Sequence, residues 1–143
     1  MSKISVVYWS GTGNTESMAN AIAKGITDAG KEVECVTVAE ASVDNLKEQA
    51  VFALGCPAMG AEVLEETEME PFVAEIEAFA AGKQIALFGS YGWGDGEWMR
   101  DWVERMKAVG AIIVNGEGLM CNEAPDDEII VACEALGAQL AGL

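Results

Sequence analysis

The residues with the clearest chemical potential form a short glycine-rich loop near the start of the chain. The loop follows an apolar run, Ile4 to Trp9, and precedes a helix-like segment that begins near Glu16. Glycines let the backbone approach an anion, and the N–H groups of the loop and of the helix start direct partial positive charge at one point. The loop therefore predicts a site for one terminal phosphate, formed by Ser10, Gly11, Thr12, Gly13, Asn14 and Thr15.

The same loop contains no lysine or arginine. This separates it from the nucleoside-triphosphate loop, in which a Gly-Lys-Ser/Thr ending reaches the outer phosphates and a magnesium ion. A polar turn that only caps the helix is the alternative interpretation.

Two further loops of small residues follow predicted strands. Segment 56–62 offers Met59 as a soft apolar surface, Glu62 as an acceptor for a ring N–H, and Gly60, beside which a peptide can rotate between two orientations. Segment 90–97 places Trp93 between glycines, where stacking on a planar ligand is worth about 0.5–1.5 kcal/mol beyond burial. The alternatives are an ordinary turn glycine at position 60 and an indole at position 93 that folds back on the core.

Strand and helix patterns alternate along the whole chain, which predicts one α/β domain over residues 1–143 with a parallel sheet. We expect strands at 4–9, 33–38, 50–55, 84–89 and 111–114, the last resuming at 119–121, and helices at 16–29, 42–48, 71–80, 97–109 and 126–141. In the fourth of these helices, Trp98, Trp102 and Met106 share one face and are interpreted as core residues rather than as ligand contacts. Because ligands bind outside the carboxyl ends of parallel strands, the three loops should converge.

Composition narrows the function further. A formal charge of −16 disfavours nucleic acid and anionic membranes and favours basic protein partners. The chain has no histidine, and its four cysteines lack paired spacing, so we expect no metal site, reduced and mostly buried thiols, and a cytoplasmic protein. Without the commonest general acid/base of neutral pH, any chemistry is expected to belong to a cofactor.

Three segments, 7–16, 54–60 and 88–98, together resemble the FMN-binding segments of the flavodoxins, specifically the short-chain kind of anaerobic bacteria. The resemblance implies a three-layer flavodoxin-like fold, with a five-stranded parallel sheet of order 2-1-3-4-5 and helices on both faces. It also implies that the first loop holds the FMN phosphate, that Met59 and Trp93 flank the ring, that Gly60 presents its carbonyl to flavin N5–H, and that Glu62 bonds N3–H. The remaining cofactor-binding positions that it implies are Pro57, Ala58, Ala61, Ser90, Tyr91, Gly92, Gly94 and Gly96. Pro57 stands where some relatives carry a phosphate-binding hydroxyl, and Ala61 stands where some carry a polar or acidic residue.

The function that follows is that of a low-potential one-electron carrier and not an enzyme, cycling mainly between neutral semiquinone and anionic hydroquinone. Its expected partners are basic surfaces of reductases and other oxidoreductases, which it meets as a monomer. An acidic ring of Glu62, Glu65, Glu66, Glu68, Asp95 and Glu97 is expected around the electron exit. An FMN-dependent NAD(P)H or quinone reductase on the same fold is the alternative. A phosphoryl-accepting receiver domain is disfavoured, because Trp9-Ser10 and Gly55-Cys56 stand where its acidic cluster would be.

Overall fold

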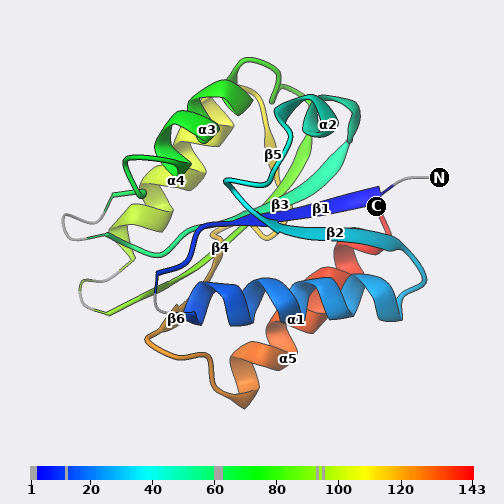
Figure 1. The fold of residues 1–143 in the computed structure, drawn as a ribbon, viewed down its shortest axis with the longest axis vertical. Coiled ribbons are helices and arrows are strands. Elements are labelled where there is room, and N and C mark those ends of the chain that lie inside the picture. Colours follow the sequence, from blue (N-terminus) through cyan, green and yellow to red (C-terminus); the bar gives the residue numbers. More distant parts are fainter. Residues whose placement is uncertain (1–2, 12, 60–62, 93, 95) are drawn as a thin grey trace.

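The structure is a computed structural model that describes residues 3–11, 13–59, 63–92, 94 and 96–143. Strands and helices alternate along the chain (Figure 1). The strands are β1 (Lys3–Tyr8), β2 (Glu32–Thr37), β3 (Val51–Gly55), β4 (Gln84–Tyr91), β5 (Ile112–Ile113) and β6 (Leu119–Asn122). The helices are α1 (Asn14–Asp28), α2 (Val43–Glu48), α3 (Met69–Glu77), α4 (Glu97–Ala108) and α5 (Asp127–Ala141).

All strand pairs in the sheet are parallel, and the order is β2-β1-β3-β4-β5, with β6 also pairing with β4. The predicted order 2-1-3-4-5 is therefore confirmed, and the expected fifth strand is found as two short pieces. Between them, the Asn115 side chain accepts from the N–H of Leu87 and donates to its carbonyl, so the side chain replaces strand pairing where the backbone leaves the sheet. Gly116 and Gly118, in the same segment between β5 and β6, have positive φ angles of 60° and 84°.

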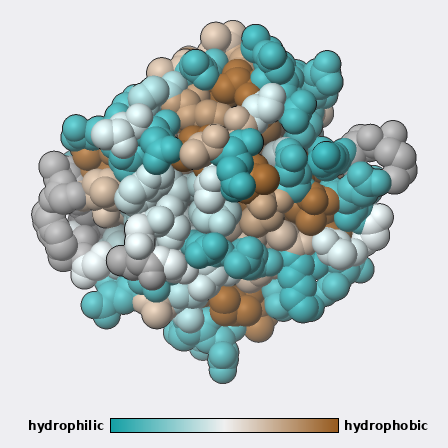
Figure 2. All heavy atoms as spheres, in the orientation of Figure 1, coloured by the Kyte–Doolittle hydropathy of each residue, from teal (hydrophilic) through white to brown (hydrophobic). Residues whose placement is uncertain are grey.

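Helices cover both faces of the sheet, which gives the predicted three layers (Figure 1). Alternate strand side chains point to opposite faces, so Phe52 and Leu87 pack in one core while Val6 and Phe88 pack in the other. The first core contains residues of α2, α3 and α4, and the second contains residues of α1 and α5. Figure 2 shows mainly hydrophilic side chains on the surface facing the viewer, with hydrophobic atoms visible between them.

Trp98, Trp102 and Met106 are 1%, 1% and 0% exposed and lie in the first core, as the helical spacing predicted. Their helix, α4, is also joined to α3 through Arg105. The guanidinium binds the Glu70 carboxylate through two hydrogen bonds of 2.8 and 2.6 Å and also contacts Glu77. This planar, bidentate geometry fixes the two helices beside each other.

Several predicted boundaries were wrong by a few residues. Helix α1 begins at Asn14 rather than at Glu16, and β4 extends two residues beyond Gly89. Helix α3 begins at Met69, so Pro71 is its third residue, where a missing N–H leaves no intrahelical hydrogen bond unmade. The same helix ends at Glu77 rather than at Ala80, because the chain there tightens into a turn in which Ala78 and Phe79 donate to carbonyls three residues back.

Two glycines set the distance between α1 and α5. A Cβ atom added to Gly137 would lie 2.1 Å from the Ile22 carbonyl oxygen, and one added to Gly25 would lie 2.0 Å from the Glu134 carbonyl oxygen. Backbone atoms cannot move aside as side-chain ends do, so only glycine permits the two helices to approach this closely.

We therefore expect Gly137→Ala to lower the free energy of unfolding by about 1–3 kcal/mol, despite alanine's higher helix propensity. Gly142→Ala is the matched control, since the nearest atom to its added Cβ is 3.6 Å away. Urea unfolding of both variants measures the difference, and a Gly137→Ala protein as stable as the control would contradict the close helix contact.

Candidate functional site

The loops that follow β1, β3 and β4 converge at one edge of the sheet, as predicted (Figure 1). Three backbone hydrogen bonds link them at the strand ends: Trp9 N–H to Gly55 O at 3.0 Å, Cys56 N–H to Phe88 O at 3.1 Å, and Ala58 N–H to Ser90 O at 2.9 Å. The loops are therefore built on adjacent strands of one rigid scaffold.

The first loop turns into α1 through Gly13, whose φ of 94° belongs to the left-handed region that glycine adopts at low cost. The Ser10 hydroxyl accepts from the N–H groups of Gly13 at 3.1 Å and Glu16 at 3.3 Å, which fixes the shape of the turn. Among the described residues, the N–H groups of Asn14 and Thr15 meet no acceptor. Free N–H groups at a helix start, with no cationic side chain in the loop, suit a phosphate group. Thr12 lies outside the described residues.

Thr15 and Ser90 make a contact that the sequence did not predict. Both residues are buried, at 0% and 4% exposure, and their hydroxyl oxygens lie 3.1 Å apart. The contact joins the helix that follows the phosphate-type loop to the end of β4, 75 residues away in the sequence. No signal local to either segment could have revealed it.

The second and third loops flank this edge of the sheet. Pro57, Ala58 and Met59 are half-buried, and the Met59 N–H donates to the Val63 carbonyl at 3.0 Å. The predicted roles of Gly60, Ala61, Glu62 and Trp93 fall on positions outside the described residues, as does Asp95. In the third loop Tyr91 is half-buried, Gly92 and Gly94 are exposed, and Gly96 begins α4 with a φ of 91°.

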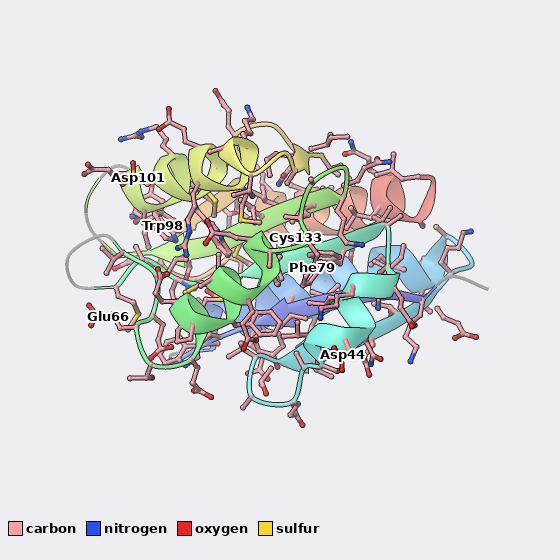
Figure 3. All side chains as sticks on the ribbon, turned by 90° about the horizontal axis from the view of Figure 1, so that it is seen from above. Asp44, Glu66, Phe79, Trp98, Asp101 and Cys133 are labelled. Carbon is pink, nitrogen blue, oxygen red and sulfur yellow. The ribbon has the colours of Figure 1, made fainter. Side chains whose placement is uncertain are left out.

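The indole of Trp98 contacts the start of the second loop and the end of β4. Its Nε1–H donates to the Cys56 carbonyl at 3.0 Å, and its ring lies 5.5 Å from the Tyr91 ring at an angle of 49°. Figure 3 shows Trp98 within the molecule, next to the ribbon of α4. The residue that fills the core therefore also fixes the starting point of the second loop.

The four cysteines are free, as expected, and three of them are buried. Burial raises the pKa of each thiol: to about 11 for Cys35 and Cys121, and to about 12 for Cys56 and Cys133. All four are therefore protonated at neutral pH and are poor nucleophiles and metal ligands. Within the described ranges, no three His, Cys, Asp or Glu residues gather as a metal site would need, and no helix is long and apolar enough to cross a bilayer.

Glu65 corrects the expected acidic ring, because it is only 6% exposed and points inward. Its carboxylate accepts hydrogen bonds from the N–H groups of Thr67 at 2.9 Å, Glu68 at 2.7 Å and Met69 at 3.0 Å, and from the Thr67 hydroxyl. Burial alone would raise the pKa of Glu65, but these hydrogen bonds outweigh it and lower the pKa to about 2. Glu65 thus anchors the second loop to the start of α3, whereas Glu66 and Glu68 are exposed and Glu66 lies at the outer margin in Figure 3.

This arrangement predicts that Glu65→Gln lowers the free energy of unfolding by about 2 kcal/mol at pH 7, because an amide cannot accept from so many donors. An unfolded glutamate titrates near pH 4.3, above the folded-state pKa. The stabilisation is therefore complete above about pH 4.3 and is lost as the pH falls towards about 2.

Urea unfolding of the apoprotein between pH 7 and pH 3 measures the gap between wild type and variant, with the exposed Glu66→Gln as control. A gap that stays constant over this range would contradict the role of the Glu65 carboxylate.

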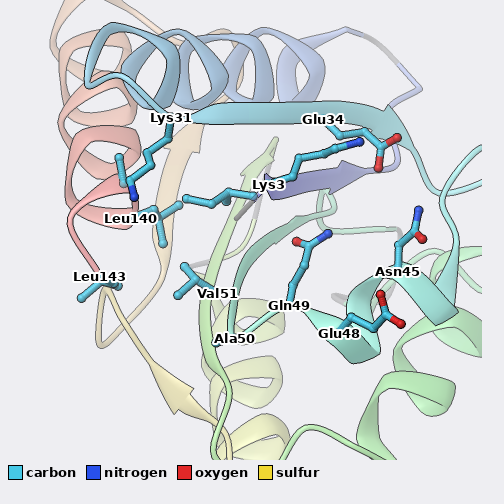
Figure 4. A pocket seen from close by; sticks show the side chains of 12 residues that line it. Lys3, Lys31, Glu34, Asn45, Glu48, Gln49, Ala50, Val51, Leu140 and Leu143 are labelled. Carbon is cyan, nitrogen blue, oxygen red and sulfur yellow. The ribbon is translucent and has the colours of Figure 1, made fainter. Parts of the chain in front are cut away.

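One hollow in the described part of the chain lies away from the converging loops. It has a volume of about 440 Å³ and lies at the opposite end of the sheet (Figure 4). Its lining comes from the amino ends of β1 and β3, the end of α2 and the end of α5, and includes Lys3, Lys31, Glu48, Gln49 and Leu140. This hollow is therefore not the candidate site, which is defined by the carboxyl ends of the strands and the loops that follow them.

A doubly wound α/β domain in which, among the described residues, the first N–H groups of α1 meet no acceptor at the carboxyl ends of the strands has an architecture common among nucleotide-binding domains. A family model described as "Flavodoxin" matches residues 6–136. The chain is 50% identical to a flavodoxin of Clostridium beijerinckii over 138 residues, covering 96% of this chain and 99% of the relative. It is 46% identical to a flavodoxin of Megasphaera elsdenii over 134 residues, covering 94% and 95%. The solution structure of two-electron reduced Megasphaera elsdenii flavodoxin matches with a TM-score of 0.88 and 44% identity, covering 98% of this chain and 99% of that one.

The chain belongs to the flavodoxin family, and its resemblance to the short-chain flavodoxins of anaerobic bacteria is confirmed. Flavodoxins are FMN-binding electron carriers that act with redox partner proteins. Membership of this family confirms three predictions: FMN as the cofactor, electron transfer as the function, and a carrier rather than an enzyme. It does not favour the alternative of a reductase.

Proposed function

We propose that this chain is a low-potential one-electron carrier whose FMN cycles mainly between neutral semiquinone and anionic hydroquinone. The observation that carries the proposal is the convergence of three loops at the carboxyl ends of β1, β3 and β4. The first of these loops, residues 10–15 (the phosphate-type loop), offers only uncharged donors. When bound, FMN supplies the one-electron chemistry, and the chain supplies the binding and the electrostatic environment.

The phosphate end of the cofactor is assigned to the first loop. The N–H groups of Asn14 and Thr15, which meet no acceptor among the described residues, support a dianion without a cationic side chain, together with the dipole of the 15-residue helix α1. The residues assigned to this end are Ser10, Gly11, Thr12, Gly13, Asn14 and Thr15.

The ring end is assigned to the second and third loops. Met59 and Trp93 would flank the ring, Glu62 would accept from N3–H, and the Gly60 carbonyl would hold a proton at N5. The other positions at this end are Pro57, Ala58, Ala61, Gly94 and Gly96, together with Ser90, Tyr91 and Gly92, which are assigned through their backbone groups. A peptide beside Gly60 that rotates to offer its carbonyl stabilises a proton at N5, which separates the two one-electron steps.

The charge of the chain lowers the second potential. A carboxylate about 10 Å from the ring disfavours a further negative charge by about 0.4–1.6 kcal/mol, which corresponds to about 20–70 mV per carboxylate. The formal charge of −16 and the lack of a cationic side chain in the three loop segments make these effects add in one direction.

The proposal predicts that stepwise reduction of the FMN-loaded protein passes through a well-populated one-electron-reduced form, seen as a long-wavelength visible band. Gly60→Ala should lower its maximum population, because a β-carbon restricts rotation of the adjacent peptide. Gly142→Ala is the control, since Gly142 lies outside the three loops and the nearest atom to its added Cβ is 3.6 Å away. A direct two-electron conversion in the wild-type protein would contradict the proposal.

The proposed partners are basic surfaces of redox proteins, which this chain meets as a monomer. Support comes from Glu66 and Glu68, which are exposed next to the second loop, although Glu68 also accepts from the Trp9 indole at 3.2 Å. The four free thiols, whose pKa values burial raises, support a cytoplasmic setting for the carrier.

Electron transfer to a small basic haem protein should therefore slow by about tenfold or more when ionic strength rises from about 10 to 300 mM. Stopped-flow spectroscopy measures the rate. An acidic haem protein of similar potential serves as the control, because salt should either accelerate its reaction or have no effect on it. A salt-independent rate with the basic protein would rule out docking through the acidic surface.

A further inference from the structure

The hydroxyl groups of Thr15 and Ser90 form a buried bridge between the first turn of α1 and the end of β4. The two oxygens are 3.1 Å apart, and the residues are 0% and 4% exposed. Within the described residues, this is the one hydrogen bond that runs directly from α1 to β4. Breaking it would leave a buried hydroxyl without a partner, so the bridge resists separation of the two elements.

Ser90 also holds the loop that follows β3. Its carbonyl accepts from the Ala58 N–H at 2.9 Å, immediately before Met59 in the chain. Ser90 itself is fixed in the sheet, where it pairs with Cys121 of β6. One residue on a rigid strand thus contacts the helix of the phosphate-type loop through its side chain and the second loop through its backbone.

A ligand with two ends is sensitive to the distance between its two subsites. Once one end is bound, the other binds intramolecularly, and its effective concentration is highest when the protein holds both subsites at the matching distance. Looser coupling between the subsites lowers this effective concentration and leaves each subsite intact.

We propose, on the basis of the function proposed above, that the bridge between Thr15 and Ser90 sets the distance between the phosphate and ring subsites. Ser90 is then a positioning residue that makes the protein select FMN over riboflavin. Riboflavin occupies only the ring subsite and inorganic phosphate only the other, so neither ligand alone senses the distance.

The test measures dissociation constants of FMN, riboflavin and inorganic phosphate for the full-length apoprotein, for Ser90→Ala, for Thr15→Val and for the double variant. Ser5→Ala is the matched control. Ser5 is also a buried strand serine, 2% exposed, and its hydroxyl accepts from Gln49 Nε2 at 2.9 Å, but it lies on β1 away from the loops.

Ser90→Ala removes the hydroxyl of the bridge and keeps the backbone groups assigned to the ring end. It should weaken FMN binding about tenfold, equivalent to about 1.4 kcal/mol, while riboflavin and phosphate binding each change by less than about twofold. The double variant should bind FMN no more weakly than Thr15→Val, because both changes break one bridge. Ser90→Cys, which keeps the volume and weakens the hydrogen bond, provides the same comparison if Ser90→Ala does not fold.

A fall of about threefold or more in the ratio of riboflavin to FMN dissociation constants supports the proposal, and a smaller change overturns it. Equal weakening of both flavins also overturns it, since that result is general destabilisation. A wild-type protein that binds neither flavin would instead contradict the proposed function.

Discussion

The proposed FMN site depends on one electrostatic constraint, which is that a doubly charged phosphate must bind in a chain of net charge −16 without a cationic side chain in the loop assigned to it. Only backbone N–H groups, uncharged side chains and the dipole of α1 are available for this purpose. The left-handed turn at Gly13 and the Ser10 hydroxyl, which accepts from Gly13 and Glu16, shape the loop, and within the described part of the chain the N–H groups of Asn14 and Thr15 meet no acceptor. Fixed dipoles of this kind can bind an anion and leave the net negative charge of the chain unchanged.

Such a site needs a framework that holds its loops in place, and β4 provides it. Ser90 contacts both α1 and the segment at Ala58, and Trp98 donates to the carbonyl at the start of the same segment. At the far end of this loop, the Glu65 carboxylate is fixed by the first N–H groups around α3. The second loop is thus anchored at Ala58 on one side and at Glu65 on the other.

Local sequence patterns predicted the strands, the helices and the convergence of the loops, because apolar periodicity and glycine-delimited turns are properties of neighbouring residues. The same patterns assigned Trp98 to the core correctly. They could not predict the contact between Thr15 and Ser90, which joins residues 75 apart, or the inward orientation of Glu65. The early start of α3 was missed for the same reason, since Glu65 rather than Pro71 fixes the beginning of that helix. The roles of Gly60 and Trp93 remain predictions.

The measurement that tests the central claim most directly is the dissociation constant of FMN as a function of sodium chloride concentration, followed by quenching of flavin fluorescence. A phosphate bound by dipoles in an acidic protein should bind more tightly as salt screens the net repulsion, by about two- to tenfold between about 10 and 300 mM. Binding that weakens with salt, as expected for a phosphate held by lysine or arginine, would contradict the account, as would an apoprotein that stays colourless in excess FMN.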